Sequence, residues 1–230
     1  MASPGTLAPE SVTQNLRLST KMNKITSVND YKFVAGDEPH TVKFLEPVIF
    51  RYIHNHNVRS VLDIGCGNGA IDRDMAELCA TVVGMDPSES GIEEAKKNCP
   101  KGKFYHLDIY DAPEAISENE FDMVVSTEVV EHIFYPRFLP RFASKKLKKG
   151  GIFLLSTPYH GYLKNVAIAA LGKWDNHHTV LWDGGHIKFW SRATLAKLLE
   201  EEGFELIGFH GCGRIPYLWK SMILVGRKKA

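Results

Sequence analysis

The sequence contains few cysteines, and their spacing matches neither a metal scaffold nor a disulfide scaffold. The four are Cys66, Cys79, Cys99 and Cys212, and no two of them form a C-x-x-C pair. The N-terminus also lacks the basic start and the apolar stretch of a signal peptide. These absences exclude a disulfide-rich miniprotein and predict a cytoplasmic protein.

The chain also lacks an excess of charge of either sign and any long apolar run. The 28 basic and 27 acidic side chains leave a net charge of +1. Nucleic-acid-binding surfaces normally need an excess of Lys and Arg on one face, so the balance disfavours a nucleic-acid partner and favours a small molecule. The longest apolar run, 166–171, is far shorter than the roughly 20 residues of a membrane-spanning helix.

Short β-branched runs alternate with helical stretches from residue 60 onward, and this alternation predicts an α/β protein with a parallel sheet covered by helices. We expect helices at 71–79, 88–98 and 191–202, and strands at 60–64, 81–85, 103–107, 121–126, 152–156, 204–209 and 221–225. Residues 1–230 are expected to form one domain, with 1–11 disordered. Two segments lie outside the alternation, an N-terminal cap at 12–57 and a lid-like insert at 159–185, and both are placed to cover a cleft.

A glycine-rich segment follows the first predicted strand and contains Asp63, Gly65, Cys66, Gly67 and Gly69. Glycine permits a positive φ and allows a ligand to approach the backbone closely. A tight turn without a ligand is one alternative, and a dinucleotide site is another, because Gly65, Gly67 and Ala70 satisfy its loose pattern. Asp63 argues against a dinucleotide, since a carboxylate repels a pyrophosphate but suits a ligand with a sulfonium and an amino group.

Two further acids end the next two predicted strands. Asp86, which precedes Pro87, can accept hydrogen bonds from both hydroxyls of a ribose. Asp108 can accept from an exocyclic amino group while Ile109 packs on the base. Alternatively, Asp108 is a plain turn residue and Asp86 a helix cap. Together the acids predict one ligand lying along the carboxyl ends of neighbouring strands.

With these motifs, residues 58–157 resemble the core of class I S-adenosylmethionine-dependent methyltransferases. The resemblance implies a Rossmann-like, seven-stranded, mostly parallel sheet, with helices on both faces and an antiparallel seventh strand between the fifth and the sixth. It also implies S-adenosylmethionine as cofactor, with the family's ribose acid at Asp86 and its adenine-side acid at Asp108. The residues expected to bind the cofactor are Asp63, Gly65, Cys66, Gly67, Gly69, Asp86, Pro87, Asp108, Ile109 and Thr127.

A Glu-x-x-Glu-His motif follows the fourth predicted strand, at Glu128, Glu131 and His132. If a helix begins near Glu128, these side chains share one face. Two carboxylates and an imidazole are reasonable ligands for a divalent cation, and His186 is a candidate fourth ligand. Alternatively, the first Glu caps a helix, the second is solvated, and His132 only orients the substrate.

The same motif resembles that of ubiquinone-biosynthesis O-methyltransferases, in which a later His-x-x-x-Phe stretch follows, as at 186–190 here. Plant small-RNA 2′-O-methyltransferases are similar, with magnesium held by two Glu and two His. The resemblance implies a catalytic and metal-binding role, for magnesium or manganese, at Glu128, Glu131, His132 and His186. The chain keeps only an echo of the ubiquinone enzymes' tryptophan-rich motif, in Tyr31, Gly36 and His40, and it has no extra RNA-binding module.

We therefore predict methyl transfer to a hydroxyl oxygen of a small molecule by in-line displacement. A metal would lower the pKa of that hydroxyl; without one, His132 or His186 would be the general base, with His160 in reserve. The alternatives are an RNA 2′-O-methyltransferase and a protein that binds the cofactor without turnover. Aromatic residues in the insert suit an aromatic or lipid-like acceptor, and its apolar stretch at 162–171 suits either a lid or peripheral membrane contact.

Overall fold

The computed structural model describes residues 40–178 and 180–229. The disorder expected at 1–11, the beginning of the cap at 12–39 and the motif residues Tyr31 and Gly36 therefore lie outside the described residues. Within the described ranges, no helix is both long enough and apolar enough to span a membrane.

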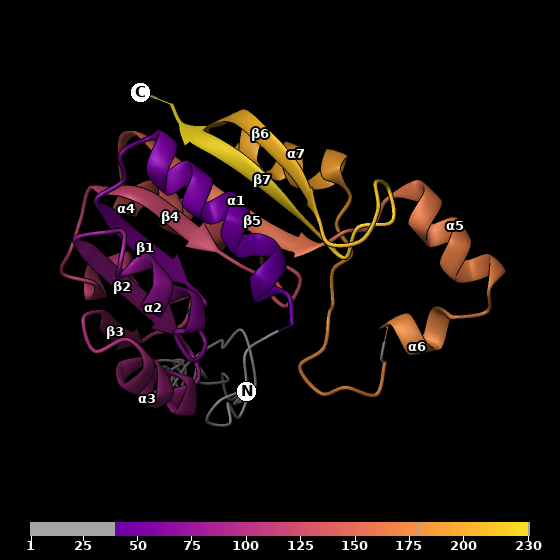
Figure 1. The fold of residues 1–230 in the computed structure, drawn as a ribbon, viewed down its shortest axis with the longest axis horizontal. Helices are drawn as coiled ribbons and strands as arrows, with labels where there is room; N and C mark the ends of the chain where they lie inside the picture. The colour runs from indigo at the N-terminus through magenta and orange to yellow at the C-terminus, as the bar shows by residue number, and fades with distance from the viewer. Residues whose placement is uncertain (1–39, 179, 230) are drawn as a thin grey trace, which may run out of the picture.

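The sheet has seven strands in the order β3-β2-β1-β4-β5-β7-β6 (Figure 1). Their bounds are β1 (Ser60–Ile64), β2 (Thr81–Asp86), β3 (Lys103–His106), β4 (Phe121–Ser126), β5 (Leu147–Pro158), β6 (Phe204–Cys212) and β7 (Ser221–Lys228). The first five strands pair in parallel, and β7 pairs antiparallel with both β5 and β6. This arrangement confirms the predicted mostly parallel sheet with its antiparallel seventh strand.

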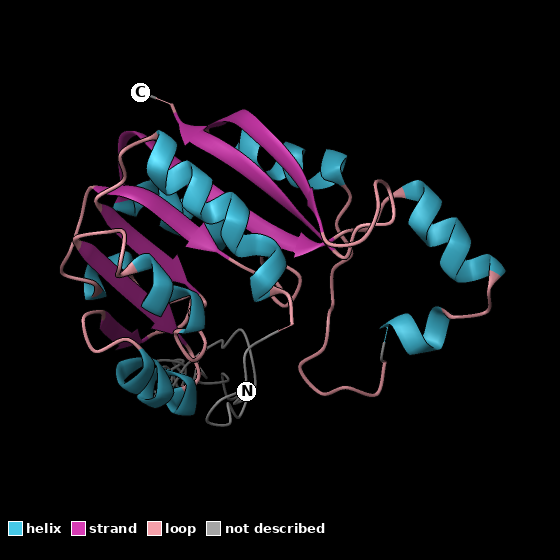
Figure 2. Ribbon diagram, viewed as in Figure 1, coloured by secondary structure: helices cyan, strands magenta, loops and turns pink. Residues whose placement is uncertain are grey.

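Helices cover both faces of the sheet (Figure 2). One face packs against α1 (Val42–Asn55), α2 (Ala70–Met75) and α3 (Glu89–Asn98), and the other against α4 (Phe138–Lys146) and α7 (Arg192–Glu201). Because side chains alternate along a strand, Val61 joins the first of these cores and Leu62 joins the second. The chain leaves β1 for β2 on one side and later returns to β4 on the other, so a crevice opens at the carboxyl ends of β1 and β4.

Two predicted helices begin where their capping residues indicate. Ser88 accepts a hydrogen bond from the Gly91 backbone N–H (3.1 Å) at the start of α3, and Ser191 accepts one from the Thr194 N–H (3.2 Å) at the start of α7. Helix α2 ends at Met75, earlier than the predicted 71–79, and β5, β6 and β7 extend beyond their predicted ends. The elements themselves are those that the alternation predicts.

The segment after β4 does not form the helix expected near Glu128. Glu128 has a φ of +55°, in the left-handed region, and the next helix, α4, begins only at Phe138. The Glu128 backbone N–H donates to Ser156 Oγ (3.0 Å), and Ser156 Oγ donates back to Glu128 Oε1 (2.7 Å). This pair of hydrogen bonds to β5 holds Glu128 in a loop, so the helical spacing that we expected for the motif is wrong.

The insert leaves the sheet at the carboxyl end of β5 and contains α5 (Tyr162–Ala170) and α6 (Trp174–His178). In Figure 1 both helices extend beyond the edge of the layered body, and the chain returns from them in an irregular segment toward α7. Helix α5 forms from the apolar stretch at 162–171. A short 3-10 helix, η1 (Pro113–Ala115), lies between β3 and β4.

Candidate active site

A cavity of about 460 Å³ opens at the carboxyl ends of β1, β2 and β4. Many of its lining residues lie at these three strand ends: Asp63, Gly65, Cys66, Gly67, Asp86, Pro87, Ser88, Thr127, Glu128 and Val129. The first turn of α1 contributes Val42 and Leu45. The end of the insert contributes Trp182, and His186 follows directly after the insert. The described part of the expected cap is thus α1, which packs on the sheet and also reaches the cavity.

The glycine loop needs glycine for the packing of its neighbours as well as for its backbone angles. Gly65 has a φ of +83°, and a Cβ added there would lie 2.3 Å from Val129 Cγ2. Gly69 has a φ of +72°, and its added Cβ would lie 2.9 Å from the Ala95 Cα. Side chains at these positions would push the glycine loop away from the loop after β4 and from α3, so the glycine loop keeps its shape only with glycine.

Asp86 ties the glycine loop to the end of β2. Its Oδ2 accepts from the Gly67 backbone N–H (2.9 Å), and its Oδ1 accepts from the Ser88 N–H (2.8 Å). Burial raises the pKa of Asp86 to about 6, although these two backbone N–H groups act in the opposite direction. Each carboxylate oxygen retains a second lone pair, so Asp86 can still accept hydrogen bonds from a ligand in the cavity.

Asp63 presents a buried oxygen that lacks a partner. Its side chain is 1% exposed, and its Oδ1 has no hydrogen-bond partner among the described residues. Burial and the neighbouring Asp86 raise the pKa of Asp63 to about 7, although a side-chain hydrogen bond with Asp72 acts to lower it. A buried carboxyl of this kind favours a ligand that brings a positive charge or a hydrogen-bond donor.

The sequence reasoning missed Asp72, which lies in α2 directly under the glycine loop. It is fully buried, and burial together with the carboxyl of Asp63 raises its pKa well above the usual range. The two acids therefore share fewer than two negative charges at neutral pH. The sequence does carry a sign of this burial, because Asp72 lies between the apolar residues Ile71 and Met75, which are buried on the same helix.

Asp108 and Ile109 lie beside the cavity and are not among its lining residues in the described chain. Asp108 Oδ1 accepts from the Tyr110 backbone N–H (3.1 Å), and the Asp108 N–H donates to Asp111 Oδ2 (2.8 Å). Ile109 is buried in the core on the α4 side of the sheet. Asp108 therefore also shapes the turn after β3, in line with the alternative raised for it.

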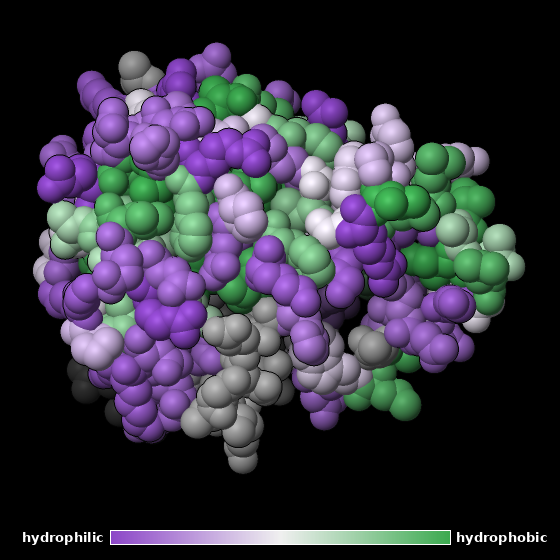
Figure 3. Space-filling model, in the orientation of Figure 1, coloured by the Kyte–Doolittle hydropathy of each residue, from purple (hydrophilic) through white to green (hydrophobic). Residues whose placement is uncertain are grey.

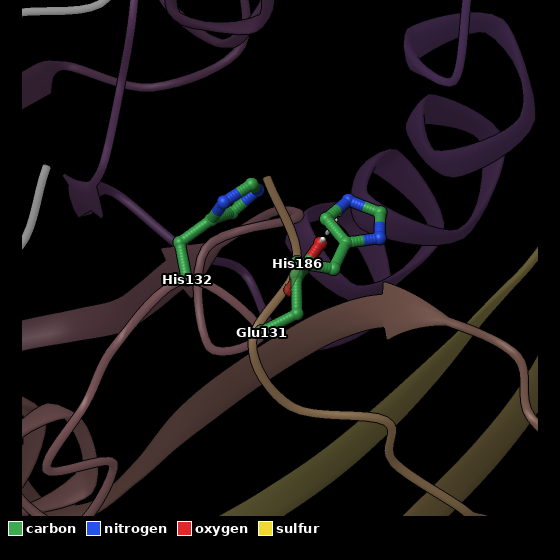
Figure 4. Close-up of side chains that lie close together, drawn as sticks. All are labelled: Glu131, His132 and His186. Atoms are coloured by element: carbon green, nitrogen blue, oxygen red, sulfur yellow. Dashed lines mark ion pairs between the residues drawn. The ribbon is translucent and has the colours of Figure 1, made fainter. Parts of the chain in front are cut away.

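Three of the four predicted metal ligands come together, namely Glu131, His132 and His186 (Figure 4). One ligand atom from each lies within 4.8 Å of the others. Glu131 Oε1 is 3.9 Å from His186 Nε2, and this buried oxygen has no hydrogen-bond partner among the described residues. The loop after β4 and the end of the insert thus bring together a carboxylate and two imidazoles, a set that suits a divalent cation.

Hydrogen bonds orient two of these side chains, those of His132 and Glu131. His132 Nδ1 lies 2.8 Å from the Gly184 carbonyl oxygen, so this nitrogen carries the proton and Nε2 keeps a lone pair for a ligand. Thr157 Oγ1 donates to Glu131 Oε2 (3.0 Å). The Glu131 carbonyl accepts from the backbone N–H groups of Ile187 and Lys188 (both 3.0 Å), which holds the two segments together.

The titration of the group favours ligand chemistry over proton transfer by the imidazoles. Burial, and then His132, lower the pKa of His186 to about 4, and burial also lowers that of His132. Both rings are neutral near pH 7, as metal-binding imidazoles are. Burial and Glu128 raise the pKa of Glu131 well above its usual range, so a nearby cation would favour its ionised form.

Glu128 lines the cavity but lies outside this group of ligand atoms. Its Oε1 accepts from Ser156 Oγ (2.7 Å), and its Oε2 accepts from Ser221 Oγ (3.1 Å). Burial raises the pKa of Glu128 to about 7, although both serine hydroxyls act to lower it. The carboxyl is thus held by β5 and β7 with a pKa suited to proton exchange near neutral pH.

The sequence of residues 39–208 matches the family described as a methyltransferase domain. The chain belongs to this family. This confirms the resemblance to class I S-adenosylmethionine-dependent methyltransferases that the glycine loop and the strand-end acids indicate.

Curated relatives named ubiquinone biosynthesis O-methyltransferase are similar to the chain. The relative from Dinoroseobacter shibae is 36% identical over 159 residues, which cover 66% of this chain and 62% of the relative. The relative from Azorhizobium caulinodans is 30% identical over 183 residues, which cover 73% of this chain and 70% of the relative. The chain thus spans less than two thirds of the first relative's length.

Solved methyltransferase structures share the fold. The N-methyltransferase NodS from Bradyrhizobium japonicum, in complex with S-adenosyl-L-homocysteine, gives a TM-score of 0.62 at 16% identity and covers 84% of this chain and 90% of its own. Magnesium protoporphyrin IX methyltransferase from Synechocystis gives 0.62 at 19% identity, with 80% and 82% covered. This likeness confirms the Rossmann-like fold.

Proposed function

We propose that this methyltransferase-family protein transfers the methyl group of S-adenosylmethionine to a hydroxyl oxygen of a small molecule. The observation that carries the proposal is one cavity lined by both Asp63 and Asp86 and by two members of the Glu131, His132 and His186 group. The acids suit a cationic methyl donor, and the second group suits activation of an oxygen acceptor. A merely cofactor-binding protein would not need the second group.

The residues present fit S-adenosylmethionine. We propose that Asp63 Oδ1, which has no hydrogen-bond partner among the described residues, accepts from its amino group, and that Asp86 accepts from the ribose hydroxyls. The backbone of the glycine loop lines the cavity, and Gly65 has no side chain that would keep the cofactor from this backbone. The cofactor, when bound, supplies an electrophilic methyl group. The residues around it bind and orient the donor and exclude water.

A divalent cation such as magnesium or manganese also fits the donor set. Glu131, His132 and His186 would hold it, with Oε1 of Glu131 as a buried oxygen that has no hydrogen-bond partner among the described residues. Glu128, the fourth predicted ligand, is held by Ser156 and Ser221 instead. When bound, the cation would lower the pKa of a hydroxyl acceptor.

The chain itself provides a proton acceptor beside this group. We infer that Glu128, with its pKa raised by burial to about 7, accepts the hydroxyl proton, because a base works best when its pKa lies near the working pH. His186, whose pKa burial lowers to about 4, is a weaker base. Of the two roles suggested for His132 and His186, we therefore assign them that of metal ligand. The role of general base passes to Glu128.

The experiment that tests the proposal uses purified protein, labelled S-adenosylmethionine and a panel of catechols, sugars and hydroxy acids. Labelled methyl groups should appear on an acceptor oxygen, and Glu131→Gln should abolish transfer while leaving the affinity for S-adenosylhomocysteine unchanged. The matched control Glu205→Gln changes an exposed acid on β6 and should keep full activity. A protein that binds NADH and ignores millimolar S-adenosylhomocysteine would overturn the proposal.

The insert supports a further part of the proposal, peripheral contact with a lipid surface. On α5, Tyr162, Leu163 and Val166 are exposed, and Leu171 beyond its end is exposed as well. The space-filling view shows hydrophobic residues gathered in the region of α5 (Figure 3). Exposed apolar side chains on one helix are typical of contact with a bilayer surface.

A further inference from the structure

Strand β5 extends beyond the point where its neighbour β4 ends. The pairing with β4 stops at Leu155, whereas β5 continues through Ser156 and Thr157 to Pro158. Antiparallel pairing with β7 holds this extension in place. The side chains of the extension can therefore hold the loop that follows β4, where backbone pairing between the two strands has ended.

The two hydroxyl residues of this extension lie on opposite faces of the sheet, because successive side chains alternate along a strand. Thr157 is on the same face as Leu155, which packs in the core against α4 and α7. Ser156 is on the same face as Leu154, which packs in the core on the α1 side. Both hydroxyl residues are completely buried, so each is available only to a buried partner.

Each hydroxyl holds one glutamate of the Glu-x-x-Glu-His motif, but the two glutamates are held differently. Glu128 is hydrogen-bonded at both oxygens, since Oε1 accepts from Ser156 and Oε2 from Ser221. Glu131 Oε2 accepts from Thr157 Oγ1 (3.0 Å), while its Oε1 has no hydrogen-bond partner among the described residues. A buried carboxyl with a purely structural role is expected to have both oxygens paired, as Glu128 has.

The second oxygen of Glu131 faces the imidazoles. Oε1 lies 3.9 Å from His186 Nε2, which is too far for a hydrogen bond (Figure 4). Two atoms that each lie about 2.1 Å from one cation are separated by about 3 to 4 Å. The spacing between the carboxylate oxygen and the imidazole nitrogen therefore suits a cation held between them.

The Thr157 hydroxyl fixes which oxygen of Glu131 takes this position. The Glu131 backbone is already held, because its carbonyl accepts from the Ile187 and Lys188 N–H groups. The carboxyl could still turn about the last bond of the side chain, where rotation is easy. The hydrogen bond from Thr157 to Oε2 opposes this rotation and leaves Oε1 facing His186.

We propose that Thr157 is a positioning residue, whose hydroxyl holds Oε2 of Glu131 and thereby presents Oε1 as the oxygen ligand of a divalent cation. The inference rests on the cation set of the proposed function and deepens it by adding a residue that acts through one of the ligands. Groups that hold a metal ligand from behind contribute to metal affinity although they never touch the metal. Ser156 has no such role, because it holds Glu128, which lies outside the ligand group.

The test measures Mn²⁺ binding by electron paramagnetic resonance, with protein freed of metal by a chelator and with neither acceptor nor S-adenosylmethionine present. Thr157→Val replaces the hydroxyl with a methyl group and should weaken Mn²⁺ binding roughly 10- to 100-fold, because Glu131 is no longer held. Thr157→Ser keeps the hydroxyl and should bind Mn²⁺ nearly as tightly as the unmodified protein.

The matched control is Ser156→Ala, which removes a buried hydroxyl from the neighbouring position of β5 and leaves the Thr157 hydrogen bond in place. Its Mn²⁺ affinity should be unchanged. Its kcat should fall, because Ser156 holds the proposed base Glu128. Saturating Mn²⁺ should therefore restore most of the kcat of Thr157→Val and none of that of Ser156→Ala.

A purely structural role for Thr157 predicts a different result. Thr157→Val would then lower the melting temperature of the metal-free protein and leave the Mn²⁺ affinity of the folded protein unaltered. That result, an equal loss of affinity in Thr157→Ser and Thr157→Val, or absence of Mn²⁺ binding to the unmodified protein would each overturn the inference. If Thr157→Val does not fold, Thr157→Ala compared with Thr157→Ser makes the same test.

Failure of this inference can be distinguished from failure of the proposed function, because Mn²⁺ binding is measured without turnover. Weakened binding in Thr157→Val, together with no methyl transfer to any acceptor, supports the positioning role and counts against the proposed function alone. Methyl transfer by a protein whose Mn²⁺ affinity does not depend on the Thr157 hydroxyl overturns the positioning role alone.

Discussion

At the residue scale, the Asp86 carboxylate has two roles that one substitution tests together. It holds the Gly67 and Ser88 N–H groups and also faces the cavity. A hydrogen bond to a charged group contributes about 1.5–3 kcal/mol, so Asp86→Asn should weaken S-adenosylhomocysteine binding roughly 10- to 100-fold in calorimetric titration. The control Asp175→Asn, on exposed α6, should bind normally. Equal affinities in both variants would remove Asp86 from the cofactor site.

The buried acids also predict how cofactor binding depends on pH. Burial raises the pKa of Asp63 from 3.8 to about 7 and that of Asp86 to about 6. The free folded protein therefore binds more protons than the unfolded chain between about pH 4 and pH 7, and the contribution of these acids to stability falls as pH rises through that range. A cationic donor prefers ionised acids, so its affinity should rise between about pH 5 and pH 8 with proton release. Calorimetric titrations at several pH values give the affinity, and repeating them in buffers of different ionisation enthalpy gives the number of protons released. An affinity that falls as pH rises would contradict this account.

At the scale of elements, the cap of α7 is a local signal with a measurable energy. Ser191 accepts from the Thr194 N–H, and Leu195, Leu198 and Leu199 of the same helix are buried. Ser191→Ala should cost about 1 kcal/mol of unfolding free energy and lower the melting temperature by about 2–4 °C. Ser191→Asp keeps a capping oxygen and should melt close to the unmodified protein. Equal melting of the alanine and aspartate variants would show that the cap contributes little.

The starts of α3 and α7 depend on nearby residues, whereas the loop at Glu128 depends on a residue far away in the chain. Ser88 and Ser191 cap helices through backbone groups three residues away, so the sequence around them was enough to predict where α3 and α7 begin. The helix expected at Glu128 failed because Ser156, which is distant in the chain, holds Glu128 in a left-handed conformation. Helical spacing in the sequence carries no information about such a partner.

At the scale of the whole molecule, the insert reaches the cavity through Trp182 and also carries an exposed apolar surface. The triple variant Leu163→Ser, Val166→Ser, Leu171→Ser removes three exposed apolar side chains from the insert. Each such side chain contributes up to about 1.5–3 kcal/mol when it is buried, so co-sedimentation with phospholipid vesicles should fall at least tenfold. The control Ile215→Ser, outside the insert, should sediment as before. Equal pelleting of the triple variant and the unmodified protein would rule out membrane contact through α5.

The sequence by itself determined the sheet and the acidic end of the cavity, which we propose holds the cofactor. Strand periodicity, the positive φ at Gly65 and Gly69, and acids at strand ends are local requirements, and residues such as Asp63 and Asp86 then meet because parallel strands end at one edge. Only the tertiary structure decided which of the four predicted ligands converge. Those positions depend on contacts between the loop after β4, the insert and β7, and contacts between segments far apart in the chain leave no periodic pattern in the sequence.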